Sequence, residues 1–425
     1  MNARDYAIYL LDRTFLPGWT SRIIEFRDNL PPEDPRDLDL AEQVQTGVTK
    51  NLILLQRLVQ HYSGRTMRSI SEPIQKMLAA GIYQIRELTR IPAPAVVFET
   101  VEQSRRLGFP QAAGFCNAIL RKCADRPKEN PPFGNDPSEM ALVLYSHQKV
   151  VYHKIRKLVG VPAALELCKH HNRTPPIIVR LLGKTSVEDL NATGLSAVAH
   201  ADKGLAVLTE ARREQLAKLA NEGMAQVQDA TSAATVSYLD VQPGQAVLDR
   251  CAGRGTKTMQ ILDLAGKTGR VVAMDSDAKR IESLRASVAA RGATNVNVVL
   301  GKSMADVADA PKRFDRILID APCSNSGVLA RRAEARFHQT DRELESVQNL
   351  QRDILLDTIG ELSVGGKLVY ATCSIWPEEN EQQVRWLLSQ DPKLALLEEK
   401  STLPNPTEDP TQYRDGGYVA VLTRR

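Results

Sequence analysis

Residues 316–327 read Arg-Ile-Leu-Ile-Asp-Ala-Pro-Cys-Ser-Asn-Ser-Gly, and they bring a carboxylate and a thiol together where a buried strand is predicted to end. Residues 317–319 form a short apolar run of the kind that a parallel strand buries on both faces. Asp320 and Pro322 end this run, so Cys323 lies just past the carboxyl end of the strand. Ligands bind at that edge in open α/β sheets, and the stretch therefore predicts a site there.

A second stretch of the chain repeats this design. Residues 368–370 predict a strand that follows a glycine turn at 365–366, and the strand ends in Thr-Cys-Ser with Cys373 at the centre. Because the carboxyl ends of parallel strands meet at one edge of a sheet, we expect Asp320, Cys323 and Cys373 to form one site.

Strands and helices alternate around these two stretches. A helix is expected at 279–291, and the alternation predicts a doubly wound, mostly parallel, Rossmann-like sheet. The predicted strands of this sheet are 246–249, 271–275, 296–300, 316–319, 367–371 and a terminal strand at 417–423.

The rest of the chain predicts smaller parts in front of the sheet. Residues 1–126 carry only helical periodicity and predict a compact all-α domain, and four prolines mark 127–137 as a linker. Residues 138–226 combine a helix with a strand at 177–180 and predict a small α+β subdomain. Residues 227–425 form the predicted sheet domain.

Composition narrows the class of protein. The chain has 425 residues, 43% of them hydrophobic and 25% charged, and no apolar run approaches the ~18 residues of a membrane span. Charges close to the N-terminus leave no core for a secretory signal, so we expect a cytoplasmic protein without a membrane partner. The six cysteines include no Cys-x-x-Cys pair, which argues against a metal site. Three of them, Cys116, Cys123 and Cys168, are expected to be small buried hydrophobes.

Basic residues are concentrated between positions 145 and 184. This window holds eight Lys and Arg against one acid, a charge of +7, whereas the whole chain carries only +4. Four of the seven histidines also fall in the window. A solvated charged surface and a polyanionic partner are both consistent with this pattern.

The loop after the first strand of the sheet suits an adenosine cofactor. Glycines let backbone amides approach a ligand, and Asp275, which ends the next strand, can accept hydrogen bonds from ribose hydroxyls. The third glycine of a dinucleotide loop is missing, and Thr256 replaces a glycine that a phosphate loop needs. S-adenosylmethionine fits better, because it needs no pyrophosphate cradle. The predicted cofactor-binding residues are Cys251, Ala252, Gly253, Arg254, Gly255, Thr256, Lys257, Asp275 and Asp320.

Three motifs resemble those of the RNA cytosine-C5 methyltransferases of the Sun family. They are Asp-Ala-Pro-Cys-Ser at 320–324, Ala-Thr-Cys-Ser at 371–374 and Pro-Glu-Glu-Asn-Glu at 377–381. The segment 76–122 resembles the NusB-like RNA-binding domain, for example in Ala-Ala-Gly-Phe-Cys-Asn at 112–117. Together these resemblances point to the bacterial members of the family that act on 16S ribosomal RNA.

The resemblance implies a fold, a cofactor and a chemistry. The fold would be α/β, with a class I Rossmann-like S-adenosylmethionine methyltransferase domain preceded by a small α+β subdomain and an all-α NusB-like domain. The partner would be ribosomal RNA, and we expect a monomer. The resemblance implies that Cys373 is the nucleophile and that Cys323 assists product release. Asp320 would hydrogen-bond the cytosine edge or lie against the cofactor.

Cytosine chemistry independently calls for a thiol. C5 of cytosine is too poor a nucleophile to attack a methyl sulfonium unaided, so a thiolate must first add to C6. Two departures from the family concern the cofactor. The family usually has Ala-Pro-Gly-Gly-Lys where this chain has Gly-Arg-Gly-Thr-Lys at 253–257, and Lys302 stands where an Asp is usual, with Asp306 as the candidate substitute.

Two other functions stay open at this point. In one, the NusB-like half makes the protein a non-catalytic RNA-binding or antitermination factor with a degenerate cofactor loop. In the other, the protein is a DNA cytosine methyltransferase, and Cys323 is then the nucleophile.

Overall fold

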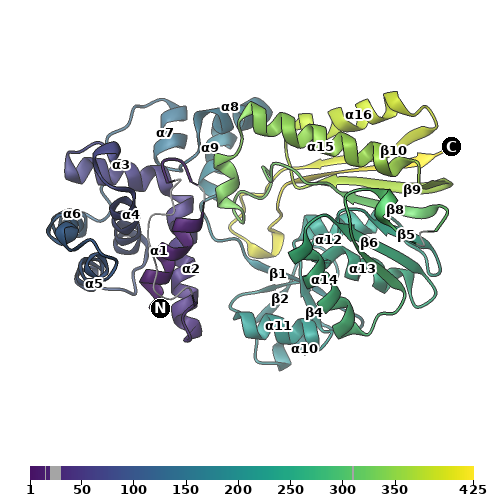
Figure 1. The fold of residues 1–425 in the computed structure, drawn as a ribbon, viewed down its shortest axis with the longest axis horizontal. Helices are drawn as coiled ribbons and strands as arrows, with labels where there is room; N and C mark the ends of the chain where they lie inside the picture. Colours follow the sequence, from purple (N-terminus) through teal and green to yellow (C-terminus); the bar gives the residue numbers. More distant parts are fainter. Residues whose placement is uncertain (15, 20–29, 309–310) are drawn as a thin grey trace. The chain divides into compact units, whose positions relative to one another are not determined.

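The chain forms two compact units in the computed structural model (Figure 1). The first unit comprises Met1–Thr174 and Leu329–Gln339, and the second comprises Pro175–Val328 and Thr340–Arg425. The segment Leu329–Gln339 therefore belongs to the helical unit, although it lies between two elements of the second unit along the chain. The structure describes residues 1–14, 16–19, 30–308 and 311–425.

The described part of the first unit is helical, as predicted for the N-terminal domain. Pro73 lies in the first turn of its central helix, α4, which is buried along almost its whole length. Among the described residues, no helix combines the length and the apolar character that crossing a lipid bilayer requires. The helices are α1 (Ala3–Arg13), α2 (Pro35–Lys50), α3 (Leu52–Ser63), α4 (Glu72–Glu87), α5 (Ala93–Arg106), α6 (Ala113–Asp125), α7 (Pro137–Val143), α8 (Lys149–Val159) and α9 (Val161–His170).

The division between the units lies at a different place from the predicted linker. We predicted that residues 138–174 share a subdomain with residues 175–226, but they pack in the first unit, where α7 lies against α3. The boundaries at 126, 138 and 227 stay predictions about which parts of the chain can fold alone.

A small sheet opens the second unit. Its four strands are antiparallel in the order β2-β3-β1-β4, and the helices α10 and α11 accompany them. The predicted strand at 177–180 is β1. The elements are β1 (Ile177–Leu181), α10 (Val187–Ala192), β2 (Ala197–Ala199), β3 (Leu205–Leu208), α11 (Arg213–Asn221) and β4 (Ala225–Val227).

The large sheet of the second unit has the strand order β10-β11-β9-β8-β5-β6-β7. The five strands from β9 to β7 are parallel, and β11 and β10 add an antiparallel pair at one side. This confirms the predicted Rossmann-like α/β fold, although β10 was not predicted. The strands are β5 (Ala246–Asp249), β6 (Arg270–Asp275), β7 (Val296–Leu300), β8 (Phe314–Asp320), β9 (Leu362–Thr372), β10 (Leu394–Thr402) and β11 (Gly417–Arg424).

Helices cover both faces of this sheet, with α15 and α16 on one side and α12, α13 and α14 on the other (Figure 1). Successive strand residues point to opposite faces. Ile317 and Ile319 of β8 accordingly pack with α15 and α16, whereas Leu318 packs with the other helices. The buried apolar run at 317–319 is thus explained by a sheet with two cores. The helices are α12 (Ala230–Ser237), α13 (Thr256–Ala265), α14 (Ala278–Arg291), α15 (Asp341–Ile359) and α16 (Glu381–Gln390).

The predicted glycine turn at 365–366 is wrong. Both glycines lie inside β9, and the pairing of β8 with β9 shifts register between Phe314 and Arg316. Gly365 has a φ of 74°, which L side chains rarely adopt, and it allows the strand to bulge without ending.

Candidate active site

The two thiols predicted to share a site lie in contact. Cys323 follows β8 and Cys373 follows β9, and these strands are parallel neighbours in which Asp320 pairs with Ala371. The two Sγ atoms are 3.0 Å apart. Both cysteines are free and partly exposed, so the carboxyl edge of the sheet presents a pair of thiols.

The surroundings of the thiols favour a protonated Cys323. The hydrogen bond with Cys373, burial, and the charges of Cys373 and Glu379 raise the pKa of the Cys323 thiol well above its ordinary value. Asn325 contacts both loops, because its amide donates to the carbonyl of Cys323 at 3.0 Å and its Oδ1 accepts from the Cys373 thiol at 3.3 Å. Asn325 has a φ of 59°, a conformation that asparagine tolerates better than most residues.

A partly buried ion pair lies beside the thiols. Lys257 Nζ, from the first turn of α13, is 2.6 Å from Asp320 Oδ2. Burial lowers the pKa of Lys257, but the Asp320 carboxylate outweighs this effect and the pKa is raised overall. A charge on Cys373 also raises the pKa of Lys257. The structure therefore joins Lys257 and Asp320, which we had assigned to the cofactor, at the end of the sheet that carries the thiols.

The cofactor loop is fastened to the end of β6. Asp275 accepts hydrogen bonds from the backbone N–H groups of Gly253 and Asp277, each at 2.9 Å. Gly253 has a φ of 56°, and a Cβ added there would meet no atom within 4 Å. The backbone at Gly253 is therefore open to a ligand.

The remaining residues of the predicted loop have distinct places. Gly255, with a φ of 92°, precedes α13, and Thr256 is the first residue of that helix. Arg254 is exposed, Ala252 is buried, and burial raises the pKa of the Cys251 thiol. The raised pKa keeps the partly exposed Cys251 thiol protonated.

Asp249, which ends β5, was not among the predicted site residues. This carboxyl group is fully buried, its Oδ2 accepts from Thr258 Oγ1 at 2.6 Å, and its Oδ1 has no hydrogen-bond partner among the described residues. Burial raises the pKa of Asp249 to about 7. An orphaned acceptor at this edge suits the cationic amine of an amino-acid cofactor, so these residues fit S-adenosylmethionine. The sequence could have indicated Asp249, because it ends a strand as Asp275 ends β6 and Asp320 ends β8.

The raised pKa of Asp249 predicts a pH-dependent stability. The folded state favours the protonated acid, so this contribution is present below pH 3.8 and is lost as the pH rises through about 7. Between pH 5 and pH 8, the wild type should lose about 3 kcal/mol of unfolding free energy relative to Asp249→Asn. Urea unfolding of the whole chain measures this difference. The exposed Glu345→Gln is the control, and parallel pH curves for wild type and Asp249→Asn would contradict the prediction.

The loop after β7 is held by two residues that the sequence did not single out. Arg250 Nη2 donates to the carbonyl of Lys302 at 2.5 Å and to Asp357 Oδ2 at 2.9 Å. Asp357 Oδ1 in turn accepts from Ser303 Oγ at 2.7 Å. Asp306 accepts from the backbone N–H groups of Lys302 and Ser303, so its carboxylate shapes this turn.

Most histidines of the basic window are not on the surface. His147, His170 and His171 are buried in the first unit, where burial and the charge of Arg336 hold the pKa values of His147 and His171 well below the ordinary range. Arg336, which has no exposed surface, donates to the carbonyls of Tyr145 and His171. These buried histidines therefore add nothing to a polyanion-binding surface.

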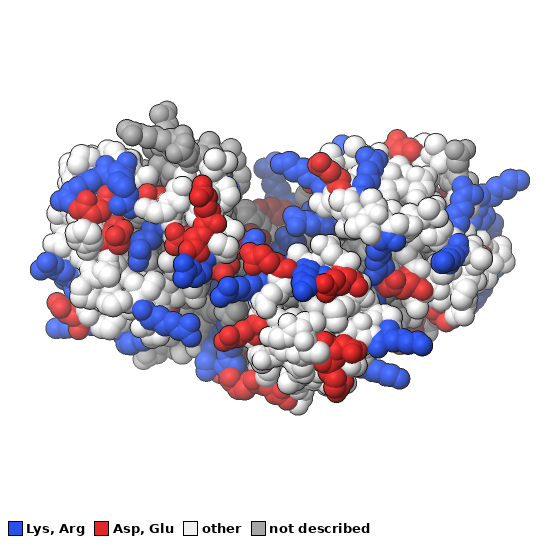
Figure 2. Space-filling view, turned by 90° about the horizontal axis from the view of Figure 1, so that it is seen from below, with Lys and Arg blue, Asp and Glu red and all other residues white. Residues whose placement is uncertain are grey.

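The helix α8 carries three of the five exposed basic side chains of the basic window, more than any other element. Val151, Tyr152 and Ile155 are buried, and Arg156 and Lys157 are exposed. By contrast with α8, the face of the second unit that carries α10, α11 and α14 shows acidic and basic side chains interspersed (Figure 2). Within the window, α8 is thus the candidate surface for a polyanion.

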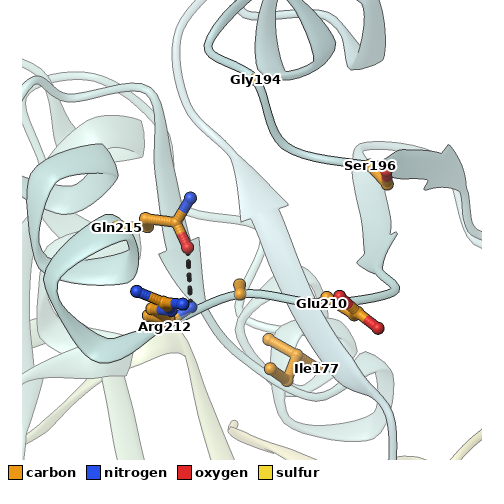
Figure 3. A pocket seen from close by; sticks show the side chains of 7 residues that line it. Ile177, Gly194, Ser196, Glu210, Arg212 and Gln215 are labelled. Atoms are coloured by element: carbon orange, nitrogen blue, oxygen red, sulfur yellow. Dashed lines mark hydrogen bonds between the residues drawn. The ribbon is translucent and has the colours of Figure 1, made fainter. Parts of the chain in front are cut away.

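A cavity of about 490 Å³ lies in the small sheet of the second unit (Figure 3). One hydrogen bond joins two of its lining residues, because the backbone N–H of Arg212 donates to Gln215 Oε1 at 2.8 Å at the start of α11. None of its lining residues was a predicted site residue. They are Ile177, Gly194, Ser196, Glu210, Ala211, Arg212 and Gln215.

Comparison with known proteins links both parts of the chain to one kind of enzyme. Residues 1–125 match the NusB family, and residues 236–417 match the 16S rRNA methyltransferase RsmB/F family. Two proteins named ribosomal RNA small subunit methyltransferase B, from Klebsiella pneumoniae and Vibrio cholerae, are each 31% identical to this chain. The matches cover 92% of this chain and 91% and 90% of those proteins.

Solved structures share the fold. The crystal structure of PH0851 has a TM-score of 0.77 at 21% identity and covers 92% of this chain and 91% of its own. A methyltransferase homolog from Pyrococcus horikoshii has a TM-score of 0.56 at 26% identity, covering 69% of this chain and 100% of its own. NSun6 from the same organism, solved with the S-adenosylmethionine analogue SFG, has a TM-score of 0.53 at 17% identity, covering 64% and 97%.

Proposed function

The chain belongs to the 16S rRNA methyltransferase RsmB/F family, and from this premise we propose that it methylates C5 of a cytosine in 16S ribosomal RNA through a covalent cysteine adduct. The cofactor is S-adenosylmethionine, which supplies a methyl group on a sulfonium when it is bound. The observation that carries the proposal is the contact between Cys323 and Cys373, 3.0 Å apart beside the Lys257–Asp320 pair.

Cys373 acts first in the proposed mechanism. Its thiolate adds to C6 of the cytosine, so an Sγ–C6 bond forms and the electron pair of the C5=C6 bond becomes available at C5. The Lys257 ammonium, held by Asp320, lies near Cys373 and stabilises negative charge there. Asp320 would hydrogen-bond the base edge or lie against the cofactor. C5 would then bond to the methyl group while the carbon–sulfur bond of the sulfonium breaks and its electron pair stays on sulfur, and C5 would still carry a hydrogen that must leave.

Cys323 acts second. Addition converts the Cys373 thiolate into a neutral thioether, which removes the charge of Cys373 that helps to raise the pKa of Cys323. Cys323 then loses its proton to water more easily, and its thiolate takes the proton from C5. The C–H electron pair restores the C5=C6 bond, the Sγ–C6 bond breaks, and Cys373 leaves as a thiolate.

Two observations weigh against the other functions considered. A DNA cytosine methyltransferase mechanism would make Cys323 the nucleophile, but the surroundings of Cys323 favour its protonated form. A non-catalytic RNA-binding factor has no need for two thiols in contact or for the orphaned Asp249 carboxyl oxygen below the cofactor loop.

Two experiments test the proposed function. Bisulfite sequencing of ribosomal RNA should reveal one 5-methylcytosine that disappears when the gene is deleted and returns with the wild-type gene. Unchanged methylation would refute the ribosomal substrate. Calorimetry of the purified protein should detect S-adenosylmethionine binding, and its absence would support the non-catalytic function instead.

The helix α8 gives a prediction about RNA binding. Replacing Lys154, Arg156 and Lys157 together by Ala should weaken binding to ribosomal RNA and leave cofactor affinity unchanged. If all three contact phosphates, the slope of log K against log salt should become shallower by about 2, because fewer counterions are released. Filter binding between 50 and 300 mM salt, roughly the range in which such slopes are resolved, measures it.

The matched control removes the same charge elsewhere. Lys218, Lys267 and Lys312 are exposed residues of the second unit, and their joint replacement by Ala should change the slope much less. Equal slopes for the α8 variant and the wild type would show that α8 is a solvated surface only.

A further inference from the structure

We propose that Glu379 is a positioning residue that holds the loops of Cys323 and Cys373 together, through hydrogen bonds to the serine that follows each cysteine. The effect of this arrangement on catalysis rests on the proposed function. The arrangement itself can be tested without RNA, by measurements on the two thiols.

The Glu379 side chain is completely buried and reaches both cysteine loops. Its Oε1 accepts from the backbone N–H of Ser324 at 2.8 Å, and its Oε2 accepts from the hydroxyls of Ser324 and Ser374, each at 2.5 Å. Gln351 of α15 also donates to Oε1, at 3.2 Å. These four donors are neutral, and together they satisfy a carboxylate that burial would otherwise strongly disfavour.

The serines transmit the position of Glu379 to the thiols. Ser324 is bonded directly to Cys323, and Ser374 directly to Cys373, so one carboxylate sets the distance between two chain segments 50 residues apart. Ser326 Oγ contacts Ser374 Oγ at 2.9 Å, and no hydrogen bond joins it to Glu379 among the described residues. Glu379 is the group that both Ser324 and Ser374 share. Displacing it should let the loops separate.

The backbone around Glu379 is itself fixed. Tyr370 of β9 donates its hydroxyl to the carbonyl of Glu379 at 2.7 Å. The next residue, Asn380, accepts from Thr372 Oγ1 at 2.6 Å and donates to the carbonyl of Ser374 at 3.0 Å. Glu379 is thus anchored to the strand that ends at Cys373, and its side chain reaches across to the loop of Cys323.

Glu379 also acts on the Cys323 thiol through its charge, which contributes to the raised pKa of Cys323. Charge and geometry can be separated by substitution. In Glu379→Gln, the amide oxygen can accept from the Ser324 N–H while the amide N–H groups donate to the two hydroxyls, so the contacts survive and the charge is lost. In Glu379→Ala, both are lost.

The first test follows thiol alkylation by iodoacetamide from pH 6 to pH 11, roughly spanning the ordinary thiol range, with each cysteine quantified by mass spectrometry. Glu379→Gln should shift the alkylation profile of Cys323 to lower pH. Glu381→Ala, which removes a partly exposed carboxylate two residues away, should leave the profile unchanged. No hydrogen bond joins Glu381 to either serine among the described residues.

The second test measures how firmly the thiols are held together. Glutathione disulfide oxidises the Cys323–Cys373 pair to a disulfide and is itself reduced to two glutathione thiols, so the equilibrium constant reports their effective concentration. Glu379→Ala should lower this constant about 10-fold or more. On RNA, the same variant should lose about 100-fold in kcat with an unchanged KM, because misplacement by about 1 Å has that effect.

The outcomes separate this proposal from the proposed function. If both Glu379 variants match the wild type in alkylation and in the glutathione equilibrium, the positioning role is refuted even if the protein methylates RNA. If the thiol measurements change as expected but the wild type modifies no RNA, the positioning role stands and the proposed function fails. Should Glu379→Ala not fold, Glu379→Asp takes its place in the glutathione equilibrium, because it keeps the charge but is too short to reach both serines; an equilibrium constant equal to that of the wild type would refute the positioning role.

Discussion

Cys373→Ala should abolish both methyl transfer and every covalent protein–RNA species. Without the thiol at the end of β9, no Sγ–C6 bond forms and C5 never becomes nucleophilic. Loss of a catalytic nucleophile typically lowers the rate by about 10⁴-fold or more. Transfer of a labelled methyl group from the cofactor to ribosomal RNA measures the first loss, and denaturing electrophoresis of the reaction mixture measures the second.

The control for this variant is another cysteine of the same chain. Cys116 is buried in the helical core of the first unit and burial raises the pKa of its thiol to about 12, so Cys116→Ala should keep methyl transfer. Cofactor binding by Cys373→Ala should also be retained. A Cys373→Ala protein that still forms an RNA adduct would refute the assignment of the nucleophile.

Cys323→Ala should have a different effect, namely the accumulation of a covalent protein–RNA complex. Addition and methylation need only Cys373, but elimination needs a base for the C5 proton, and Cys323 is the thiol in contact with Cys373. Turnover should fall at least ~100-fold, as for loss of a general base. With RNA and cofactor present, a band resistant to denaturing electrophoresis should therefore appear.

The double variant is the control for trapping. Cys323→Ala combined with Cys373→Ala should show no adduct, because the bond to C6 is never made. If Cys373→Ala instead traps RNA while Cys323→Ala shows none, the roles are reversed and the mechanism resembles that of DNA cytosine methyltransferases.

A target cytosine in a loop should react faster than one in a duplex, since unstacking costs about a few kcal/mol less there.

Patterns within short stretches of sequence predicted the strands and the residues at their ends, because these features depend on neighbouring residues. Apolar runs followed by polar turn residues identified five parallel strands, and the residues that end them, Asp275, Asp320, Cys323 and Cys373, lie at the predicted edge. The reason is physical, because strand direction and the alternation of its side chains follow directly from the order of residues. The same logic failed at Gly365, where a positive φ produced a bulge inside a strand and no turn.

No pattern within a short stretch of sequence predicted the contacts that support the site and the helical unit. The hydrogen bond of Arg250 with Asp357 joins residues 107 positions apart, and Arg336 contacts the segment of the buried histidines from about 190 positions away. Their positions depend on how helices pack, and the pattern of a single segment does not encode that packing.

The sequence by itself determined the sheet, the two thiols at its edge and the kind of loop that precedes α13. Only the tertiary structure decided that Asp249 is buried without a second partner, that Lys257 pairs with Asp320, and that Glu379 joins the two cysteine loops. The carboxylate of an Asp or Glu can be solvated, can form an ion pair, or can accept hydrogen bonds from several chain segments. Which of these it becomes depends on burial and on the donors that distant segments bring to it, because the free energy of a buried charge is set by its surroundings.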